Sequence, residues 1–144
     1  MTDEITFEKC KALGKIKELE KSKNWVQKEI AVAENFLDTA KFNFDSERYE
    51  AVIVIGYLTI FHLNRALVYS VGKIVKTHIC AVLAVKELFK DNKAVMDLLK
   101  GIENSLVSRN KIQYDGYDAD KEMAEFLLDL GKDYLELVKK IVVK

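Results

Sequence analysis

Three residues late in the chain carry side chains that suit the binding of a phosphate group. Arg109 is one of three Arg residues among 23 Lys plus Arg, and Asn110 and Tyr114 follow it closely. A guanidinium binds a carboxylate or phosphate through two parallel hydrogen bonds, which the point charge of Lys cannot reproduce. We therefore expect Arg109 and Tyr114 to converge on one anion-binding pocket, with Asn110 turned partly towards it.

A plainer interpretation of Arg109 stays open beside this one. The residue continues the apolar stripe of a predicted helix, so it lies on the packing face; the stripe is Val95, Leu98, Leu99, Ile102 and Leu106. A cation in the last helical turn complements the helix dipole, worth ~0.3–1 kcal/mol, and it can also pair with a carboxylate. Either structural role explains a positive charge, although Lys would serve equally well.

A second polar set follows one face of an otherwise apolar segment. Thr59, His62, Arg65 and Tyr69 recur every three or four residues, which places them in a line on a helix. Polar groups inside an apolar helix must be paired or must line a cleft. We take His62, Arg65 and Tyr69 as candidate nucleotide- or RNA-binding residues, with a hydrogen-bonded structural histidine as the alternative. For His78, at a predicted helix start, we expect a structural role.

Composition excludes several other function classes. The 23 basic and 23 acidic residues balance, so binding to nucleic acid requires a local patch. The chain has no phosphate-cradling glycine loop or nucleophile elbow, and its two His and two Cys have no zinc-binding spacing. We expect no metal and no cofactor. Cys10 and Cys80 are predicted to be reduced, buried thiols rather than a disulfide.

The apolar periodicity is helical throughout the chain. Helices are expected over about 5–20 (with a break near Gly14 or Ser22), 24–43, 46–72, 78–90, 93–109 and 120 to the C-terminus. Asp45 or Ser46 is predicted to cap the central helix, Gly72 to end it, and Thr77 to cap the next. The sequence thus predicts one all-α domain over 1–144, an antiparallel up-and-down bundle of four to five main helices with almost no strand.

Neither the N-terminal segment nor the longest apolar run resembles a membrane signal. The first residues are charged and lack a hydrophobic signal core, and the apolar run 51–63 is too short to cross a bilayer. We expect a cytoplasmic protein that has no membrane partner.

Two stretches of this chain resemble the HEPN domain family (higher eukaryotes and prokaryotes nucleotide-binding), in its small single-domain prokaryotic branch. "GYLTIFHLNRALVYSVG", with "KTH" shortly after, is similar to the family's first helical hairpin, and "SRNKIQYDGY" is similar to its Arg-Asn-x-x-x-Tyr segment. The resemblance covers nearly the whole chain and implies a helical bundle that forms a homodimer.

The resemblance also implies a class of function. Many HEPN proteins are metal-independent ribonucleases, often toxins encoded beside a nucleotidyltransferase antitoxin, whose active site is an Arg, a polar residue and a His at the dimer cleft. Arg109 and Asn110 match the first two positions, and Tyr114 stands where the His is expected. A phenol, with a pKa of ~10, is a poor base near neutrality. We therefore take Arg109, Asn110 and Tyr114 as the candidate catalytic residues of a site that we expect to bind nucleotide or RNA, in a protein that acts with a nucleotidyltransferase partner. An active ribonuclease toxin and a purely structural interaction bundle are the alternatives.

Overall fold

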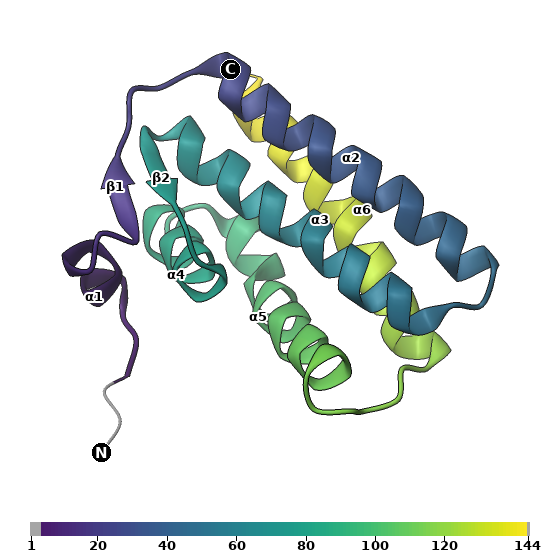
Figure 1. The fold of residues 1–144 in the computed structure, drawn as a ribbon. Helices are drawn as coiled ribbons and strands as arrows, with labels where there is room; N and C mark the ends of the chain where they lie inside the picture. The colour runs from purple at the N-terminus through teal and green to yellow at the C-terminus, as the bar shows by residue number, and fades with distance from the viewer. Residues whose placement is uncertain (1–3, 144) are drawn as a thin grey trace.

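The structure is a computed structural model that describes residues 4–143. The elements in chain order are α1 Phe7–Ala12, β1 Ile16–Glu18, α2 Lys23–Asp45, α3 Tyr49–Ser70, β2 Lys73–Val75, α4 His78–Leu88, α5 Lys93–Gln113 and α6 Lys121–Val142. The predicted all-α bundle is confirmed, and the two short strands pair with each other. Figure 1 shows α2, α3 and α6 running side by side, while α1, β1, β2 and α4 gather at one end.

Helix α3 is the central element of the bundle. It contacts α2, α4, α5 and α6 (Figure 1), so nearly every face of the helix is covered by another. Length and composition alone would let α3 cross a membrane, but most of its apolar window is buried inside the fold. At Gly56 the backbone of α3 approaches α6 so closely that a Cβ there would lie 3.1 Å from the Cβ of Leu127. The all-round apolar sequence of α3 is therefore that of a core helix.

The turn between α2 and α3 corrects the predicted cap. Asp45 is the last residue of α2 and Ser46 is its C-cap, so neither starts α3. The N-cap of α3 is Arg48, whose side chain makes no capping hydrogen bond. Glu47, at a φ of 59°, reverses the chain between the two helices. Residues 46–48 alone connect the two long antiparallel helices. The residues expected to cap the start of α3 therefore belong to the end of α2.

The N-terminal segment departs in part from the expected helix over 5–20. That helix ends at Ala12, and the break expected near Gly14 is present, because Gly14 adopts a φ of 71° that a helix cannot contain. The chain then forms β1, in which Ile16 pairs antiparallel with Val75 of β2. Both of these side chains are buried, so tertiary pairing outweighs local helical preference here.

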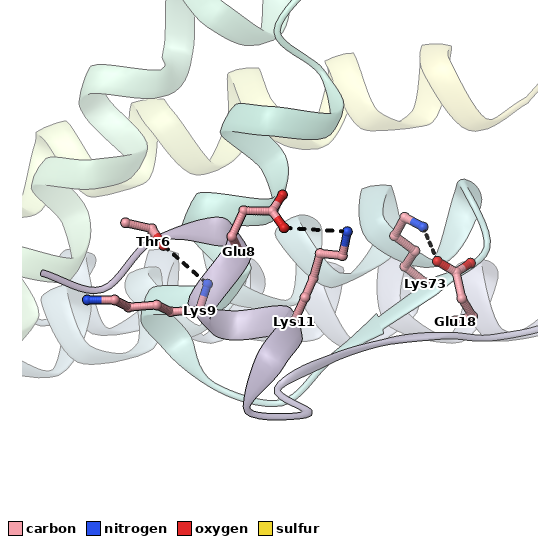
Figure 2. Close-up of polar contacts among 6 residues, drawn as sticks. All are labelled: Thr6, Glu8, Lys9, Lys11, Glu18 and Lys73. Atoms are coloured by element: carbon pink, nitrogen blue, oxygen red, sulfur yellow. Dashed lines mark hydrogen bonds and ion pairs between the residues drawn. The ribbon is translucent and has the colours of Figure 1, made fainter. Parts of the chain in front are cut away.

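Polar contacts within this segment and with β2 are weaker than its apolar attachment to the bundle. In Figure 2 the Thr6 hydroxyl accepts a hydrogen bond from the Lys9 backbone N–H at 3.1 Å, which caps α1. An ion pair joins Lys73 of β2 to Glu18 of β1. Glu18 is largely exposed, so this pair contributes little to stability. Burial at Ile16 and Val75 is the main attachment of β1 to the bundle.

A disulfide adds a covalent link to the same region and corrects the expectation of two reduced thiols. Cys10 of α1 and Cys80 of α4 are bonded, with their Cα atoms 5.8 Å apart and 70 residues between them. Both are buried. The β1–β2 pairing places α1 beside the first turn of α4, and this long-range arrangement brings together two cysteines that have no spacing signature.

Candidate functional site

Arg109 lies on the packed face of α5, close to the end of the helix. The helix continues four residues beyond the predicted end, and Tyr114 is its C-cap. The Arg109 side chain is only 8% exposed, and its Nη1 donates to the Tyr114 hydroxyl at 3.1 Å and to Oε1 of Gln113 at 3.2 Å. The expected convergence of Arg109 and Tyr114 is thus seen as direct contact, while their role in binding stays a prediction.

Aromatic rings, rather than carboxylates, surround the Arg109 guanidinium. Its Cζ lies 4.8 Å from the ring centroid of Tyr57 in α3 and 5.4 Å from that of Tyr114, which are cation–π distances. Within residues 4–143 no Asp or Glu forms an ion pair with Arg109. Its Nε is buried and has no hydrogen-bond partner there. The ion-pair interpretation of Arg109 therefore finds no partner in the described chain.

His78 is a residue of the site that the sequence did not reveal. It is the first residue of α4, just after the N-cap Thr77, whose hydroxyl accepts from the Cys80 N–H. Its Nδ1 lies 2.7 Å from the Tyr57 hydroxyl, and its ring packs 4.3 Å from the ring of Phe61. Tyr57 and Phe61 of α3 therefore hold the imidazole in place. Tyr57 also contacts the Arg109 guanidinium, so it lies between the two side chains.

The electrostatics of this group leave one charge at neutral pH. Burial lowers the pKa of His78 below its ordinary value, and the positive charge of Arg109 and the neighbouring His62 lower it further. Burial raises the pKa of Tyr57 to about 12, although the Arg109 charge opposes the rise. A neutral phenol therefore contacts a neutral imidazole, and the guanidinium is the charged member of the trio.

A pocket of about 370 Å³ opens beside these residues, between the N-terminal segment, the start of α4 and the end of α5. Its lining residues are Ile5, Cys10, Leu13, Lys15, Thr77, His78, Ile79, Cys80, Leu106, Arg109 and Asn110. The disulfide thus forms part of the wall. The pocket combines two cations, Arg109 and Lys15, with the N-terminal end of α4, which carries a partial positive charge. Asn110 lines the pocket as expected, whereas Tyr114 lies outside the lining and is exposed.

Three residues of the second predicted set, His62, Arg65 and Tyr69, form a separate cluster with Glu29 of α2. The Thr59 hydroxyl instead donates to the Ile55 carbonyl oxygen within α3. Oε2 of Glu29 lies 2.6 Å from Nδ1 of His62, and its Oε1 lies 3.4 Å from Nη2 of Arg65. Arg65 also donates to the Tyr69 hydroxyl and stacks near the rings of Tyr69 and Phe61. The sequence analysis did not identify Glu29 as a partner, since nothing local links it to α3.

This Glu29 cluster, comprising Glu29, His62, Arg65 and Tyr69, does not join the Arg109 pocket. None of its members lines that pocket, and Tyr69 lines another of about 760 Å³ beside the start of α2. Glu29 already contacts the side chains of both His62 and Arg65. The nucleotide-binding role predicted for His62, Arg65 and Tyr69 stays a prediction, and their geometry is that of an internally paired cluster.

Among the described residues no three His, Cys, Asp or Glu side chains gather as metal ligands do, so no metal centre is assigned.

Comparisons with known proteins agree with the resemblance noted in the sequence. The protein named putative toxin MJ0142, from Methanocaldococcus jannaschii, is 29% identical over 131 residues, which cover 90% of this chain and 88% of that protein. The family model of the HEPN domain matches residues 22–141, which include His78, Arg109 and Tyr114. The chain belongs to the HEPN domain family.

Proposed function

We propose that this chain is a toxin-type HEPN protein that binds the phosphate of an RNA or nucleotide in the Arg109 pocket. Its family membership and its relative from Methanocaldococcus jannaschii, which is named a putative toxin, support this class of function. The proposal includes a nucleotidyltransferase partner acting as antitoxin and a cytoplasmic location. It requires neither a metal nor a cofactor, since the chemistry needed for binding comes from side chains.

The observation that carries the proposal is the charge of Arg109 without a counter-charge. The side chain is almost fully buried, its Nε has no partner, and no carboxylate of residues 4–143 pairs with it. Burying an unpaired cation is costly, so such a group is expected to meet an anion in its functional state. A phosphate would contact Arg109, Lys15 and the N-terminal end of α4, and a pocket of this size admits a single nucleotide.

A homodimer, which the family resemblance implies, is part of the proposal. The most apolar helix, α3, is covered within one chain and offers no free face to a second copy. Support comes instead from the pocket mouth, where the apolar side chains of Ile5, Leu13 and Ile79 are exposed. A second copy covering them would place Arg109 in a cleft. Sedimentation should show a dimer that Leu13→Asp dissociates, and a parent protein that stays monomeric at high micromolar concentration would contradict this.

The test of binding compares two conservative replacements. Arg109→Lys keeps the charge but loses the planar fork, so it should weaken binding of a short single-stranded RNA by roughly ten- to a hundredfold. Arg48→Lys, at the N-cap of α3, is the matched control and should bind like the parent. Fluorescence anisotropy at one fixed salt concentration measures both, since phosphate binding depends on salt. Equal affinity of the Arg109→Lys protein and the parent would refute the proposal.

A second candidate function, metal-independent RNA cleavage, is favoured by one observation. The pocket contains an imidazole, His78, whose lowered pKa keeps it neutral at neutral pH. The purely structural bundle stays as the alternative, because Arg109 also contacts Tyr57, Gln113 and Tyr114 inside the fold, although it has no ion-pair partner among residues 4–143.

A further inference from the structure

We propose that His78 is the proton acceptor of an RNA-cleaving site in the Arg109 pocket and that Tyr57 is its positioning residue. The inference rests on the proposed function, because the RNA phosphate must first be held by Arg109. In the family motif the histidine follows the Arg in the same segment, where this chain has Tyr114. In the proposed site the histidine is His78, which belongs to α4. His78 and Arg109 line one pocket, although they come from different helices.

The surroundings of His78 fix both the ring and its free nitrogen. Nδ1 lies 2.7 Å from the Tyr57 hydroxyl, and the ring centroid lies 5.3 Å from that of Tyr57 and 4.3 Å from that of Phe61. When the phenol oxygen accepts from Nδ1–H, the neutral imidazole carries its lone pair on Nε2. None of the hydrogen bonds within residues 4–143 engages Nε2, so this nitrogen is available to a substrate in the pocket.

The chemical step uses groups of the pocket and of the RNA, together with water as the proton donor to the leaving oxygen. Nε2 of His78 takes the proton of a ribose 2′-hydroxyl, and the 2′ oxygen attacks the adjacent phosphorus. The bond from phosphorus to the 5′ oxygen breaks, and that oxygen takes a proton from water. The products are a 2′,3′-cyclic phosphate and a 5′-hydroxyl, and the imidazolium returns its proton to water. Arg109 neutralises the charge that develops on the phosphate oxygens.

Tyr114, at the motif position, is less suited to this task than His78. Its hydroxyl already accepts a hydrogen bond from Arg109, and its side chain lies outside the lining of the pocket. The groups facing His78 are Arg109 on α5, Tyr57 and His62 on α3, and Lys15 before β1. Among residues 4–143 no carboxylate lines the pocket, so the described lining does not favour the protonated imidazole, and His78 remains a base near neutrality.

The experiment separates binding from cleavage with two probes, a fluorescent single-stranded RNA and its 2′-O-methyl analogue, in buffer containing EDTA. The parent protein should bind both but cleave only the RNA, giving a 2′,3′-cyclic phosphate that mass spectrometry identifies. His78→Gln should cleave at least about a hundredfold more slowly while binding the analogue within about threefold of the parent. His78→Asn is a second variant, and circular dichroism checks that both are folded.

Tyr57→Phe tests the positioning role. Without the phenol oxygen the imidazolium loses a hydrogen bond, so the acid limb of the pH–rate profile should move to lower pH and the rate should fall, with analogue binding unchanged. A merely structural tyrosine would leave the profile in place and would contradict this role.

Three outcomes overturn the inference. The first is that the parent protein leaves the RNA intact. The second is that both folded His78 variants cleave RNA at the parent rate. The third is that His62→Gln loses cleavage while the His78 variants keep it. If the parent binds the analogue but leaves RNA intact, the inference about His78 fails and the proposed function stands. If the analogue is not bound at all, the proposed function itself fails.

Discussion

Two arginines of this chain lie against aromatic rings, yet their electrostatic surroundings differ. Arg65 stacks near Phe61 and Tyr69 and pairs with Glu29, which also binds His62. Arg109 stacks near Tyr57 and Tyr114 and has no carboxylate partner within residues 4–143. Each has a buried Nε without a hydrogen-bond partner. The presence of a carboxylate is therefore the main difference between the two sites.

This difference separates a structural arginine from a candidate ligand-binding one. A cation that is neutralised inside the protein gains nothing from an external anion, whereas an unpaired buried cation gains the full interaction when an anion arrives. The predicted binding residues of the Glu29 cluster belong to the first kind. Arg109 belongs to the second, and its pocket is where we place the function.

The largest expected effect on stability comes from breaking the disulfide. It forms part of the wall of the Arg109 pocket and does not belong to the Glu29 cluster. Replacing Cys10 and Cys80 together by Ser frees a loop of 70 residues, and loop entropy predicts a loss of about 4 kcal/mol. The melting temperature should fall by about 10 °C. A reductant should lower the parent's melting temperature and leave that of the double variant unchanged. Equal melting of the parent with and without reductant would contradict the link.

The same region shows what could be predicted of the fold. The helices of the bundle follow from stripes that repeat every three or four residues, a signal contained in the local sequence. The strand pairing of Ile16 with Val75 and the bond between Cys10 and Cys80 join segments far apart in the chain. The end of the first helix near Gly14 was readable locally, whereas the replacement of helix by strand after Gly14 depends on the tertiary pairing of β1 with β2.

A smaller effect is expected from removing the neutralising carboxylate of the Glu29 cluster. Glu29→Gln keeps the shape but leaves Arg65 and His62 without their anion, and an unsatisfied, mostly buried polar partner costs about 1–3 kcal/mol. Urea denaturation should show the loss as a lower midpoint with an unchanged slope. Glu34→Gln is the matched control, since Glu34 of α2 pairs with Lys139 at the surface and should contribute at most a few tenths of a kcal/mol. Equal loss in both variants would refute the distinction.

Replacing Arg109 with Met should not lower the free energy of unfolding, in contrast to Glu29→Gln. It removes an unpaired buried charge and keeps an apolar chain against Tyr57, so the free energy of unfolding should stay the same or rise by up to about 1 kcal/mol. RNA binding should be lost in the same protein. Arg65→Met, which leaves Glu29 unpaired, should instead destabilise. Urea titrations of both variants measure this contrast, and a strongly destabilised Arg109→Met protein would show that Arg109 is structural.

The candidate site was only partly readable in the sequence. Arg109, Asn110 and Tyr114 are close in the chain, and their contact follows from the spacing of a helix end. His78 and Lys15 reach the pocket from other elements, so no local pattern connects them to Arg109. The pairing of Glu29 with His62 and Arg65 was hidden for the same reason, because it depends on how α2 packs on α3.

The smallest expected effect is the pH dependence that His78 adds to stability. Its pKa is lowered in the folded protein by burial, by Arg109 and by His62, so below the ordinary value of ~6.5 the unfolded chain binds more protons than the folded one. Stability should therefore be lost as the pH falls from about 6.5 towards the lowered pKa, and should be constant above. His78→Gln should flatten this part of the curve, which melting temperatures of both proteins between pH 5 and pH 8 would measure. Parallel curves for the two proteins would mean that His78 is solvated like a free histidine. His78 would then no longer support the contrast between the Arg109 pocket, whose charge has no carboxylate partner among residues 4–143, and the Glu29 cluster, whose charges are paired.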